Sequence, residues 1–419
     1  MKTIFQPARD IKVRAEVDVL VVGAGPAGLM ASARSAICGN EVILIDRNEK
    51  PGKKLYITGK GRCNFTNACP PKDFLESVVT NPKFLYGALF SFTPKDAIDL
   101  IENNGIKTKV ERGNRAFPLS DKASDITKAI FKYATDNGVK FVSETVLSIS
   151  KQSDTFNITT NKQIYESESV ILCCGGLSYP TTGSTGDGYN FAQNFGHKIV
   201  KQRPALVPIL LKTSVKSLEG LSLKNVRATI KNYSLFGEML FTANGVSGPI
   251  ILSLSSLACS GQIKGEKLYI DLKPALDGIT LDKRVLSDFA KFKNKQLKNA
   301  LGELLPKRLI PFIISYCGID GEKSVNNISK EERNKLVVAI KNLEFVIDTL
   351  DDIKHAIVTA GGVDVTQVNP KTMESKLVKG LYFAGEMLDI DALTGGYNIQ
   401  IALSTGYMAG NATGRKIND

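Results

Sequence analysis

One segment near the start of the chain constrains the fold more than any other. An apolar run over residues 17–22 leads into a turn of the pattern G-x-G-x-x-G, whose glycines are Gly23, Gly25 and Gly28. Apolar residues then recur at helical spacing, and a second apolar run ends at Asp46, 18 residues after Gly28. A strand, a glycine-rich turn, a helix and a second strand that ends in an acidic residue form the fingerprint of a dinucleotide-binding βαβ unit.

Each position in this motif has a physical role. Gly23 permits the tight turn, Gly25 lets backbone N–H groups approach a pyrophosphate, and Gly28 lets the helix pack closely on the strand. The helix that begins at Pro26 and Ala27 directs the partial positive charge of its N-terminus at the phosphates. The carboxylate at the end of the second strand is expected to accept hydrogen bonds from a ribose hydroxyl group.

Length and composition set the frame for this motif. The chain has 419 residues, which predicts two or three domains, and 43% hydrophobic and 23% charged residues are typical of a soluble globular protein. No stretch has the roughly 18 uncharged apolar residues that a membrane helix needs. Residues 1–10 lack the apolar core of a signal peptide, so we expect a cytoplasmic protein.

Cysteine and histidine usage argues against a metal site. The chain contains seven cysteines without a C-x-x-C pair, and only two histidines, His197 and His355. A zinc ribbon, a thioredoxin-type redox pair and a histidine-rich metal site are therefore not expected, and a Ser-His-Asp triad has almost no candidates. Cys173 and Cys174 are adjacent in an apolar run, and buried thiols are favoured there over a vicinal disulfide.

Three later segments distinguish FAD from NAD, which the first motif alone does not do. Residues 170–176, VILCCGG, indicate a strand that runs into a glycine pair, and residues 381–386, LYFAGE, a strand that ends in Gly-Glu. A helix then opens at residues 395–398, GGYN. In FAD enzymes of the two-dinucleotide-binding class, such an acidic side chain meets the ribitol, and the helix N-terminus stabilises negative charge on the reduced flavin. These segments predict bound FAD.

Residues 59–67, GKGRCNFTN, form a polar segment that can wrap over the cofactor. Glycines allow a close approach of the backbone, Arg62 offers a planar fork of donors, and Asn64 and Thr66 offer short polar contacts. The alternative is an ordinary surface turn.

Together these segments resemble one known family. TGKGRCNFTN, CCGGLSYPTTGSTGDGY and GLYFAGEMLDIDALTGGYNIQIALSTG are similar to motifs of the bacterial aminoacetone-oxidase-like flavoproteins, which include the BaiN-like proteins of bile-acid conversion. The resemblance covers nearly the whole chain and implies an FAD-dependent oxidoreductase, although no single substrate holds across the family. The family commonly has three glycines before the arginine, and here Lys60 replaces the middle one, which affects only the detail of the phosphate contacts.

The motifs and the resemblance together predict a set of cofactor contacts. The predicted FAD-binding residues are Gly23, Gly25, Pro26, Ala27, Gly28, Asp46, Arg47, Lys54, Gly61, Arg62, Cys63, Asn64, Val146, Cys174, Gly175, Gly176, Gly385, Glu386, Gly396, Tyr397, Asn398 and Ile399.

The predicted fold is α/β, a Rossmann-like two-dinucleotide-binding FAD domain with an inserted β-rich, barrel-like subdomain and a small helical subdomain. We expect the discontinuous FAD domain at 1–197 and 352–419, the β-rich insertion at 198–278 and 344–351, and the helical subdomain at 279–343. Residues 279–314 are expected to be helical and are rich in lysine. No second G-x-G-x-x-G occurs in the insertion, which excludes a glutathione-reductase-like NAD(P)H domain.

The catalytic residues are not identified by any motif, and four candidates remain. Asp389 and Asp391 precede the last helix and are either structural carboxylates or groups that bind or deprotonate a substrate. Tyr179 lies in the glycine-rich loop at 179–188, where structural and functional roles are equally supported. Arg115 is a candidate for binding a substrate carboxylate, although an arginine at a strand edge usually meets solvent.

Two main hypotheses follow for the function. A net charge of +12 favours anionic partners or has no specific meaning. The first hypothesis is an enzyme that acts on a small organic molecule, with hydride transfer at flavin N5 and NAD(P)H or O2 as redox partner. The alternative is a flavoprotein that binds or modifies RNA through its basic helical insertion, although few aromatic side chains are available there for base stacking. A structural or sensory flavoprotein is a third reading.

Overall fold

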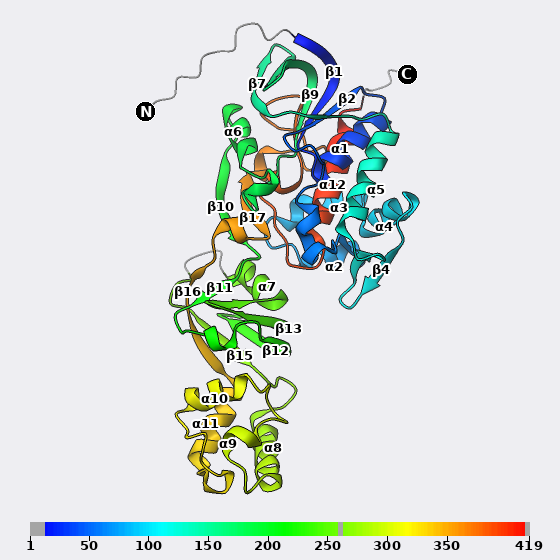
Figure 1. Ribbon diagram of the computed structural model, residues 1–419. Coiled ribbons are helices and arrows are strands. Elements are labelled where there is room, and N and C mark those ends of the chain that lie inside the picture. The colour runs from blue at the N-terminus through cyan, green and yellow to red at the C-terminus, as the bar shows by residue number, and fades with distance from the viewer. Residues whose placement is uncertain (1–12, 259–262, 415–419) are drawn as a thin grey trace. The chain divides into compact units, whose positions relative to one another are not determined.

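The computed structural model describes residues 13–258 and 263–414, so the prediction about a signal peptide in residues 1–10 lies outside the described residues. The chain forms two compact units, one from Met1–Ala205 with Ile353–Asp419 and one from Leu206–Asp352 (Figure 1). Two crossings of the chain therefore join the units, and the second unit is an insertion in the first.

A mostly parallel sheet forms the centre of the first unit. Its parallel strands lie in the order β6 (Lys140–Ser143), β2 (Val42–Asp46), β1 (Val13–Val22), β9 (Ile164–Leu172) and β18 (Leu381–Phe383). The antiparallel strands β7 (Val146–Gln152) and β8 (Thr155–Thr160) extend the sheet from the first half of β9. The middle of β1 is buried on both faces, which explains why its sequence is a continuous apolar run rather than an alternating one.

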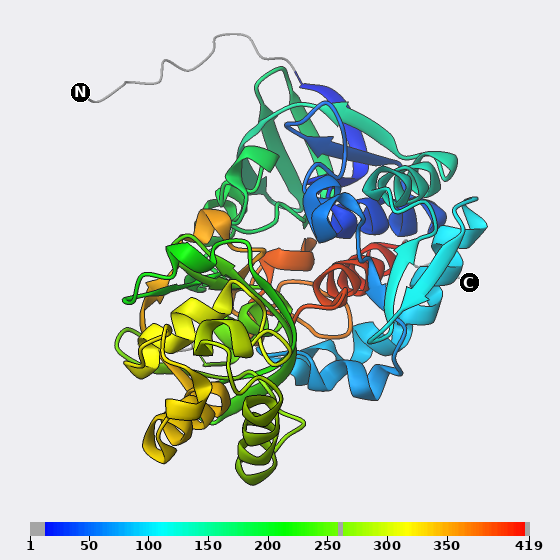
Figure 2. The ribbon, with the colours of Figure 1, turned by 60° about the horizontal axis from the view of Figure 1, so that its bottom comes forward.

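Helix α1 (Pro26–Ile37) packs on this sheet, α12 (Tyr397–Ala412) contacts its strand β18, and α5 (Ala123–Asp136) packs against α1. Helices α1 and α12 lie side by side, blue against red in Figure 1 and Figure 2. A Cβ atom on Gly406 would lie 2.3 Å from the carbonyl oxygen of Ala27, and one on Gly410 would lie 2.3 Å from that of Ala31. Small residues on both helices therefore let the two backbones approach until they touch.

Shorter elements complete the first unit. Helices α2 (Pro71–Glu76), α3 (Tyr86–Ser91), α4 (Pro94–Asn103) and α6 (Asp187–Asn194) lie in its connections. A three-stranded sheet has the order β3 (Thr66–Asn67), β5 (Arg115–Pro118) and β4 (Thr108–Glu111). Strands β10 (Ile199–Ala205) and β17 (Val358–Val363) pair antiparallel, next to the two crossings of the chain.

The second unit contains a closed antiparallel barrel. Its strands follow one another in the order β11 (Ile209–Leu211), β14 (Gly245–Ser247), β13 (Tyr233–Thr242), β12 (Ser222–Ile230), β15 (Lys267–Asp271) and β16 (Leu343–Leu350), which pairs back to β11. The apolar helix α7 (Pro249–Ala258) packs on the barrel strands. This architecture confirms the predicted Rossmann-type FAD domain fold with a barrel-like insertion.

Four helices lie between β15 and β16: α8 (Gly278–Lys291), α9 (Leu297–Ala300), α10 (Leu309–Cys317) and α11 (Lys330–Lys341). The stretch 279–314, expected to be helical, is divided among three separate helices, and Gly302 and Pro306 lie in the break between α9 and α10. Helix α11 begins at a capping box in which Ser329 and Glu332 satisfy each other's backbone N–H groups.

The boundaries observed between the two units differ in two respects from the expected ones. Strand β10 belongs to the first unit because it pairs with β17 there, so the first crossing follows Ala205 rather than residue 197. One continuous apolar core joins the barrel and helices α8–α11, so barrel and helices form a single compact unit.

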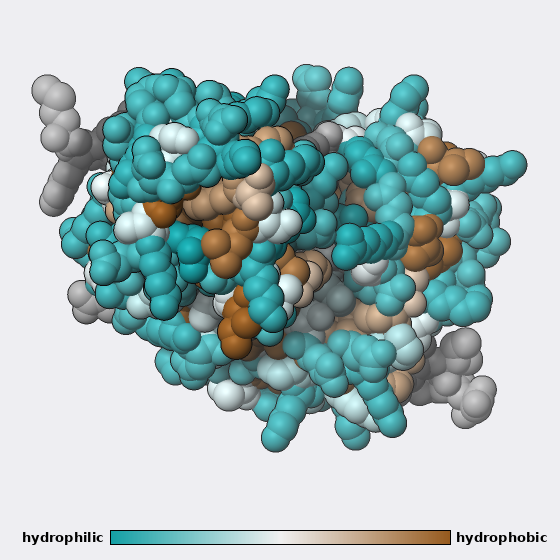
Figure 3. All heavy atoms as spheres, turned by 90° about the horizontal axis from the view of Figure 1, so that it is seen from below, coloured by the Kyte–Doolittle hydropathy of each residue, from teal (hydrophilic) through white to brown (hydrophobic). Residues whose placement is uncertain are grey.

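The surface of the molecule is mostly polar on the face drawn in Figure 3, where apolar residues form separate small patches. None of the helices in the described part of the chain is both long and apolar enough to span a bilayer.

Candidate functional site

The glycine-rich turn after β1 packs so tightly that two of its glycines are required by the protein itself. Gly23 has a φ of +102°, and a Cβ atom there would lie 2.4 Å from the carbonyl oxygen of Cys173. A Cβ atom on Gly28 would lie 1.8 Å from the carbonyl oxygen of Gly23. Gly25 differs, because a Cβ atom there would meet no protein atom within 4 Å. The turn therefore leaves a free space beside Gly25, at the N-terminus of α1.

Asp46, the last residue of β2, ties this turn to the next one. Its Oδ2 accepts a hydrogen bond from the backbone N–H of Ala24 at 2.8 Å, and its Oδ1 accepts from the backbone N–H of Asn48 at 2.8 Å. The sequence predicted a ribose contact for this carboxylate. Oδ1 also accepts from the Nδ2 of Asn48 at 2.9 Å, which uses its second lone pair. Oδ2 accepts one hydrogen bond and therefore has room for a ribose hydroxyl group, a contact that stays a prediction.

A pocket beside the turn brings several predicted residues together. Gly23, Asp46, Arg47, Val146 and Cys174 all line it, although they come from four different segments of the chain. Two acidic residues that the sequence analysis missed, Glu144 and Asp187, also line it. Arg47 forms an ion pair with Asp187.

Protein groups engage the side chain of Arg62, whose contact with FAD stays a prediction. Its guanidinium group pairs with Glu111 and with Asp121 and lies 4.2 Å from the ring centroid of Phe117. Arg62 also lowers the pKa of Glu111 through a side-chain hydrogen bond. The side chain therefore fastens the loop after Gly61 to the β4–β5 hairpin, and its donors are used by the protein. The side chain of Lys60 lies outside what the structure describes.

The two residues after Arg62 face inward. Cys63 has a φ of +58° and is fully buried, and burial raises the pKa of its thiol to about 12. The Oδ1 atom of Asn64 is buried and has no hydrogen-bond partner. A Cβ atom on Gly396 would lie 2.8 Å from this oxygen, so Asn64 holds an unused acceptor beside the start of α12.

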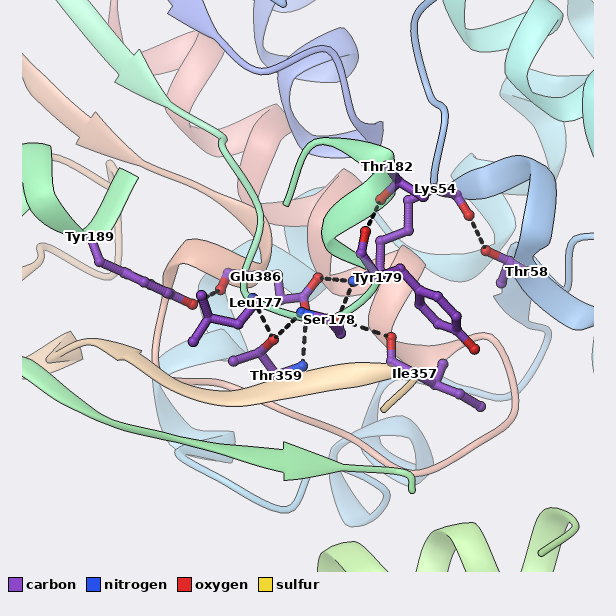
Figure 4. Close-up of polar contacts among 10 residues, drawn as sticks. All are labelled: Lys54, Thr58, Leu177, Ser178, Tyr179, Thr182, Tyr189, Ile357, Thr359 and Glu386. Carbon is purple, nitrogen blue, oxygen red and sulfur yellow. Dashed lines mark hydrogen bonds and ion pairs between the residues drawn. The ribbon is translucent and has the colours of Figure 1, made fainter. Parts of the chain in front are cut away.

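Glu386 is the centre of a polar network that Figure 4 shows. Its Oε2 lies 2.8 Å from the Nζ of Lys54, and its Oε1 accepts from the Oγ of Ser178 at 3.0 Å and from the backbone N–H of Thr359 at 2.7 Å. Lys54 also donates to the Oγ of Ser178. A Cβ atom on Gly176 would lie 2.9 Å from Glu386 Oε1. The network therefore brings four separate segments together, and Ser178 and Thr359 are members that the sequence analysis missed.

The N-terminus of α12 follows directly on two glycines, Gly395 and Gly396, with φ values of +135° and +93°. A Cβ atom on Gly396 would lie 2.4 Å from the carbonyl oxygen of Thr66. Contact with the protein's own backbone therefore requires a glycine at 396, whereas a Cβ atom on Gly395 would lie 2.7 Å from the ring of Tyr397. Asn398 does not point its amide outward, because its Nδ2 donates to the carbonyl oxygen of Ala392 at 2.8 Å.

The remaining predicted contacts lie close to these features. Gly175 adopts a positive φ, Gly385 packs on Ala27, and the Tyr397 ring meets the Phe74 ring edge-on. Ile399 is half-buried in the first turn of α12. Cys173 and Cys174 are both free thiols rather than a vicinal disulfide.

The four catalytic candidates have different environments in the structure. Asp391 is fully buried, and its Oδ1 accepts from the Oγ1 of Thr80 at 2.5 Å. Asp389 is half-buried and accepts from Asn81 at 3.2 Å. Tyr179 has a φ of +52°, and its ring points away from Glu386 (Figure 4). Arg115 begins β5, and its Nε donates to the carbonyl oxygen of Arg112 at 3.0 Å.

One residue beside Asp391 was missed by the sequence analysis. Arg203 lies on β10, and its Nη2 is 3.7 Å from the Oδ1 of Asp391. No local pattern marks it, because it is a single arginine in a strand that carries other polar residues.

The structure fits bound FAD. The space beside Gly25 lies at a helix N-terminus, where a pyrophosphate is stabilised, and the unpartnered Oδ1 of Asn64 lies at the N-terminus of a second helix. Across the described residues, no group of three or more His, Cys, Asp or Glu side chains could hold a metal ion. Fold and site together define a Rossmann-type flavoprotein.

Comparison with known families gives the more specific assignment. The family model described as "HI0933-like protein Rossmann domain" matches residues 17–412. The chain belongs to this family of FAD-dependent oxidoreductases, which confirms the resemblance that its motifs predicted.

Curated relatives match over almost their whole length. The chain is 33% identical over 397 residues to a protein named ribosomal RNA dihydrouridine synthase in Escherichia coli K12, with 93% of this chain and 96% of that protein covered. The Haemophilus influenzae protein of the same name is equally similar. The 3-dehydro-bile acid delta(4,6)-reductase of Clostridium scindens is 28% identical over 410 residues, with 94% of this chain and 98% of that protein covered.

Solved structures of flavoenzymes share the fold. A flavocytochrome c3 fumarate reductase superposes with a TM-score of 0.54 at 16% identity, covering 97% of this chain and 80% of that one. A 3-ketosteroid-delta4-(5alpha)-dehydrogenase from Rhodococcus jostii RHA1 superposes with a TM-score of 0.52 at 14% identity, covering 98% and 99%.

Proposed function

We propose that this protein reduces a carbon–carbon double bond conjugated to a carbonyl group, and that its substrate is a uridine in ribosomal RNA. The full-length similarity to two proteins named ribosomal RNA dihydrouridine synthase carries the proposal. Dihydrouridine differs from uridine by two hydrogen atoms added across C5=C6, which is conjugated to the C4 carbonyl group. The delta(4,6)-reductase relative has a name that describes the same type of reaction on a steroid.

Bound FAD would supply the hydride at N5. The described residues contribute the space at Gly25 for the pyrophosphate, the N-terminus of α12 and the Glu386 network. NAD(P)H is the proposed electron donor. It would bind only transiently, because the chain has no second G-x-G-x-x-G motif.

RNA becomes the preferred substrate because two observations agree. The relatives that match at 33% identity are named for an RNA substrate, whereas the small-molecule reductase matches at 28%. A net charge of +12 suits a polyanionic partner. Part of the basic character in α8 and α9 is neutralised locally, since Lys291 pairs with Glu303 and Lys298 with Glu322, but Lys293 and Lys295 are exposed. This order reverses the ranking that the sequence alone suggested.

A direct assay tests the proposal. Purified protein with NADPH is incubated anaerobically with ribosomal RNA that lacks dihydrouridine, and nucleosides are quantified by mass spectrometry. We expect dihydrouridine to form with the wild-type protein and not with Gly25→Leu. A protein that reduces a steroid 4,6-dien-3-one but leaves ribosomal RNA unchanged would assign the small-molecule function instead.

Salt dependence provides a second measurement. Binding through several phosphate contacts releases counterions, so the affinity for ribosomal RNA should fall by about 10³ or more between roughly 50 and 200 mM salt. Filter binding over this range measures it. Binding that does not change with salt would contradict an RNA substrate. The proposal also locates the protein with the ribosomes in the cytoplasm.

A further inference from the structure

Three buried side-chain atoms in the described part of the chain have no hydrogen-bond partner: Asn64 Oδ1, Arg203 Nη1 and Asp391 Oδ2. Buried polar groups in folded proteins are nearly always paired, so each exception calls for an explanation. Asn64 lies beside the start of α12, where FAD accounts for it. The other two atoms belong to neighbouring side chains, and neither the fold nor the cofactor explains them.

The Arg203–Asp391 pair is incomplete in its geometry. The distance of 3.7 Å between Nη2 and Oδ1 is longer than the 2.7–3.2 Å of a hydrogen bond. The Asp391 side chain is 0% exposed and the Arg203 side chain 29% exposed. A buried charge without full pairing is costly, so this arrangement indicates that a further group, which carries an acceptor for Arg203, completes the site.

The pair lies within the framework that holds Glu386. Arg203 on β10 stands opposite Ala360 on β17, and the neighbouring residue of β17 is Thr359, whose backbone N–H binds Glu386. Asp391 lies on the loop that runs from Glu386 to the N-terminus of α12. An acceptor bound at Arg203 would therefore lie beside the segments that surround the proposed flavin site.

Other cations of this region are already used by the protein. Lys54 binds Glu386 and Ser178. Arg62 binds Glu111 and Asp121, and Arg47 pairs with Asp187. Among the residues that the structure describes, Arg203 alone has a buried side-chain nitrogen without a partner.

The proposed reaction needs such a cation. When a hydride adds to the carbon β to a carbonyl group, a C–H bond forms, the C=C π bond breaks, and its electron pair moves toward the carbonyl oxygen. A proton from water then adds to the α carbon, and the C=O bond is restored. In uridine the hydride would add at C6, the charge would develop on O4, and the proton would add at C5. A fixed positive donor at that oxygen lowers the barrier.

We propose that Arg203 donates a hydrogen bond from its guanidinium group to the carbonyl oxygen conjugated to the reacting double bond, and that Asp391 is the positioning residue that holds Arg203. This inference rests on the proposed function. Arg203 is the catalytic residue because it touches the substrate, whereas Asp391 acts through Arg203. Thr80 fixes the carboxylate of Asp391 by its 2.5 Å hydrogen bond.

Half-reactions of the flavoprotein test the proposal. Enzyme reduced with dithionite under anaerobic conditions is mixed with uridine-containing ribosomal RNA or with 2-cyclohexen-1-one, and reoxidation of the flavin is followed by absorbance. We expect Arg203→Met to slow this step by about 100-fold or more, as for loss of an oxyanion donor, and Arg203→Lys to recover part of the rate. The dissociation constant for the RNA should stay within about threefold, because its other contacts remain.

Controls separate this role from charge and folding. Lys201 is exposed on the same strand, so Lys201→Met removes an equal charge and should leave the rate within about twofold. Asp391→Asn should slow reoxidation by itself but should add nothing in the Arg203→Met background, because coupled residues are not additive. FAD content and flavin reduction by NADPH should match the wild-type values in every variant.

The reoxidation rates distinguish an error in the role of Arg203 from an error in the proposed function. If neither acceptor reoxidises the wild-type flavin, the proposed function is wrong and the role of Arg203 falls with it. If the wild-type protein reacts and Arg203→Met reacts at the same rate, only the role of Arg203 is wrong. Additive losses in the double variant would reject Asp391 as the positioning residue.

Discussion

Gly25 differs from its neighbours in the turn because the protein leaves it free. Gly23 and Gly28 are glycines because a side chain would strike the backbone, whereas a Cβ atom on Gly25 meets no protein atom within 4 Å. A substitution at Gly25 therefore tests cofactor binding rather than folding.

Gly25→Leu should abolish FAD binding without unfolding the chain, because the leucine side chain would occupy the space of the pyrophosphate. Absorbance of the purified protein measures bound FAD, and circular dichroism measures the fold. Gly302→Leu is a matched control, since a Cβ atom there also meets nothing within 4 Å, and it should retain FAD. A Gly25→Leu protein with stoichiometric FAD would remove the basis of the assigned site.

Asp391 makes the stability depend on pH. Burial raises its pKa above the usual range, while Thr80 and Arg203 act in the opposite direction. A carboxyl group with a raised pKa binds its proton more tightly in the folded protein. Its contribution to the free energy of unfolding is therefore present below the unfolded pKa of about 3.9 and is lost as the pH rises through the folded pKa.

The difference in Tm between Asp391→Asn and the wild-type protein should accordingly move in favour of the variant from about pH 4 to about pH 7. Thermal unfolding at several pH values measures this. Glu111→Gln provides the opposite sign: Arg62 lowers the pKa of Glu111, so that variant should lose stability relative to the wild-type protein over the same range. Parallel curves for Asp391→Asn and wild type would refute the raised pKa.

At the scale of elements, the first turn of α12 is the feature whose charge matters most. The free N–H groups of a helix N-terminus carry a partial positive charge, and in the proposed function this end faces the flavin edge that becomes negative on reduction. Because Gly396 is required by its contact with Thr66, a substitution there would disturb the backbone itself. Ile399, half-buried in the first turn, is the better position for a test.

Ile399→Asp should lower the reduction potential of the flavin, because a carboxylate in the first turn opposes negative charge on the flavin. A dipole-scale interaction of about 1 kcal/mol corresponds to roughly 20 mV for a two-electron couple. Spectroelectrochemical titration measures it, and Ile399→Asn serves as the uncharged control of similar shape. Equal potentials in the two variants would show that this helix end does not face the flavin.

At the scale of the whole molecule, the inserted unit has the features of an independent folding unit. Its barrel is closed, its apolar core continues into helices α8–α11, and its two ends are joined by a hydrogen bond from the backbone N–H of Asp351 to the carbonyl oxygen of Pro208 at 3.0 Å. Adjacent ends and a separate core are typical of inserted domains.

A fragment of residues 206–352 should therefore fold alone, without binding flavin. A single cooperative thermal transition, seen by both circular dichroism and intrinsic fluorescence of its tyrosines, is the expected result. A fragment that remains unfolded would show that the unit needs the FAD domain for its stability.

Local patterns in the sequence were sufficient for the nucleotide-binding part of this protein. The strand, glycine turn and helix around Gly23–Gly28 depend on short-range periodicity and on backbone conformations that only glycine adopts freely, so they are legible without a partner. The β-rich insertion was also predicted from the sequence, but pairing of β10 with β17 moved its first boundary from residue 197 to Ala205. The expectation of helix over 279–314 overlooked Gly302 and Pro306, which lie between α9 and α10.

Long-range contacts decided the rest. The sequence predicted a cofactor contact for Arg62 but not its protein partners: Phe117 of β5 lies beneath its guanidinium group, and Glu111 and Asp121 bind it. Arg203 and Asp391 come from distant segments, which meet because β10 pairs with β17 and the loop before Asp391 pairs with β17 at Val363 and Leu388. The local sequence around a charged side chain does not identify its ion-pair partner, because packing of the whole domain determines which charged groups meet.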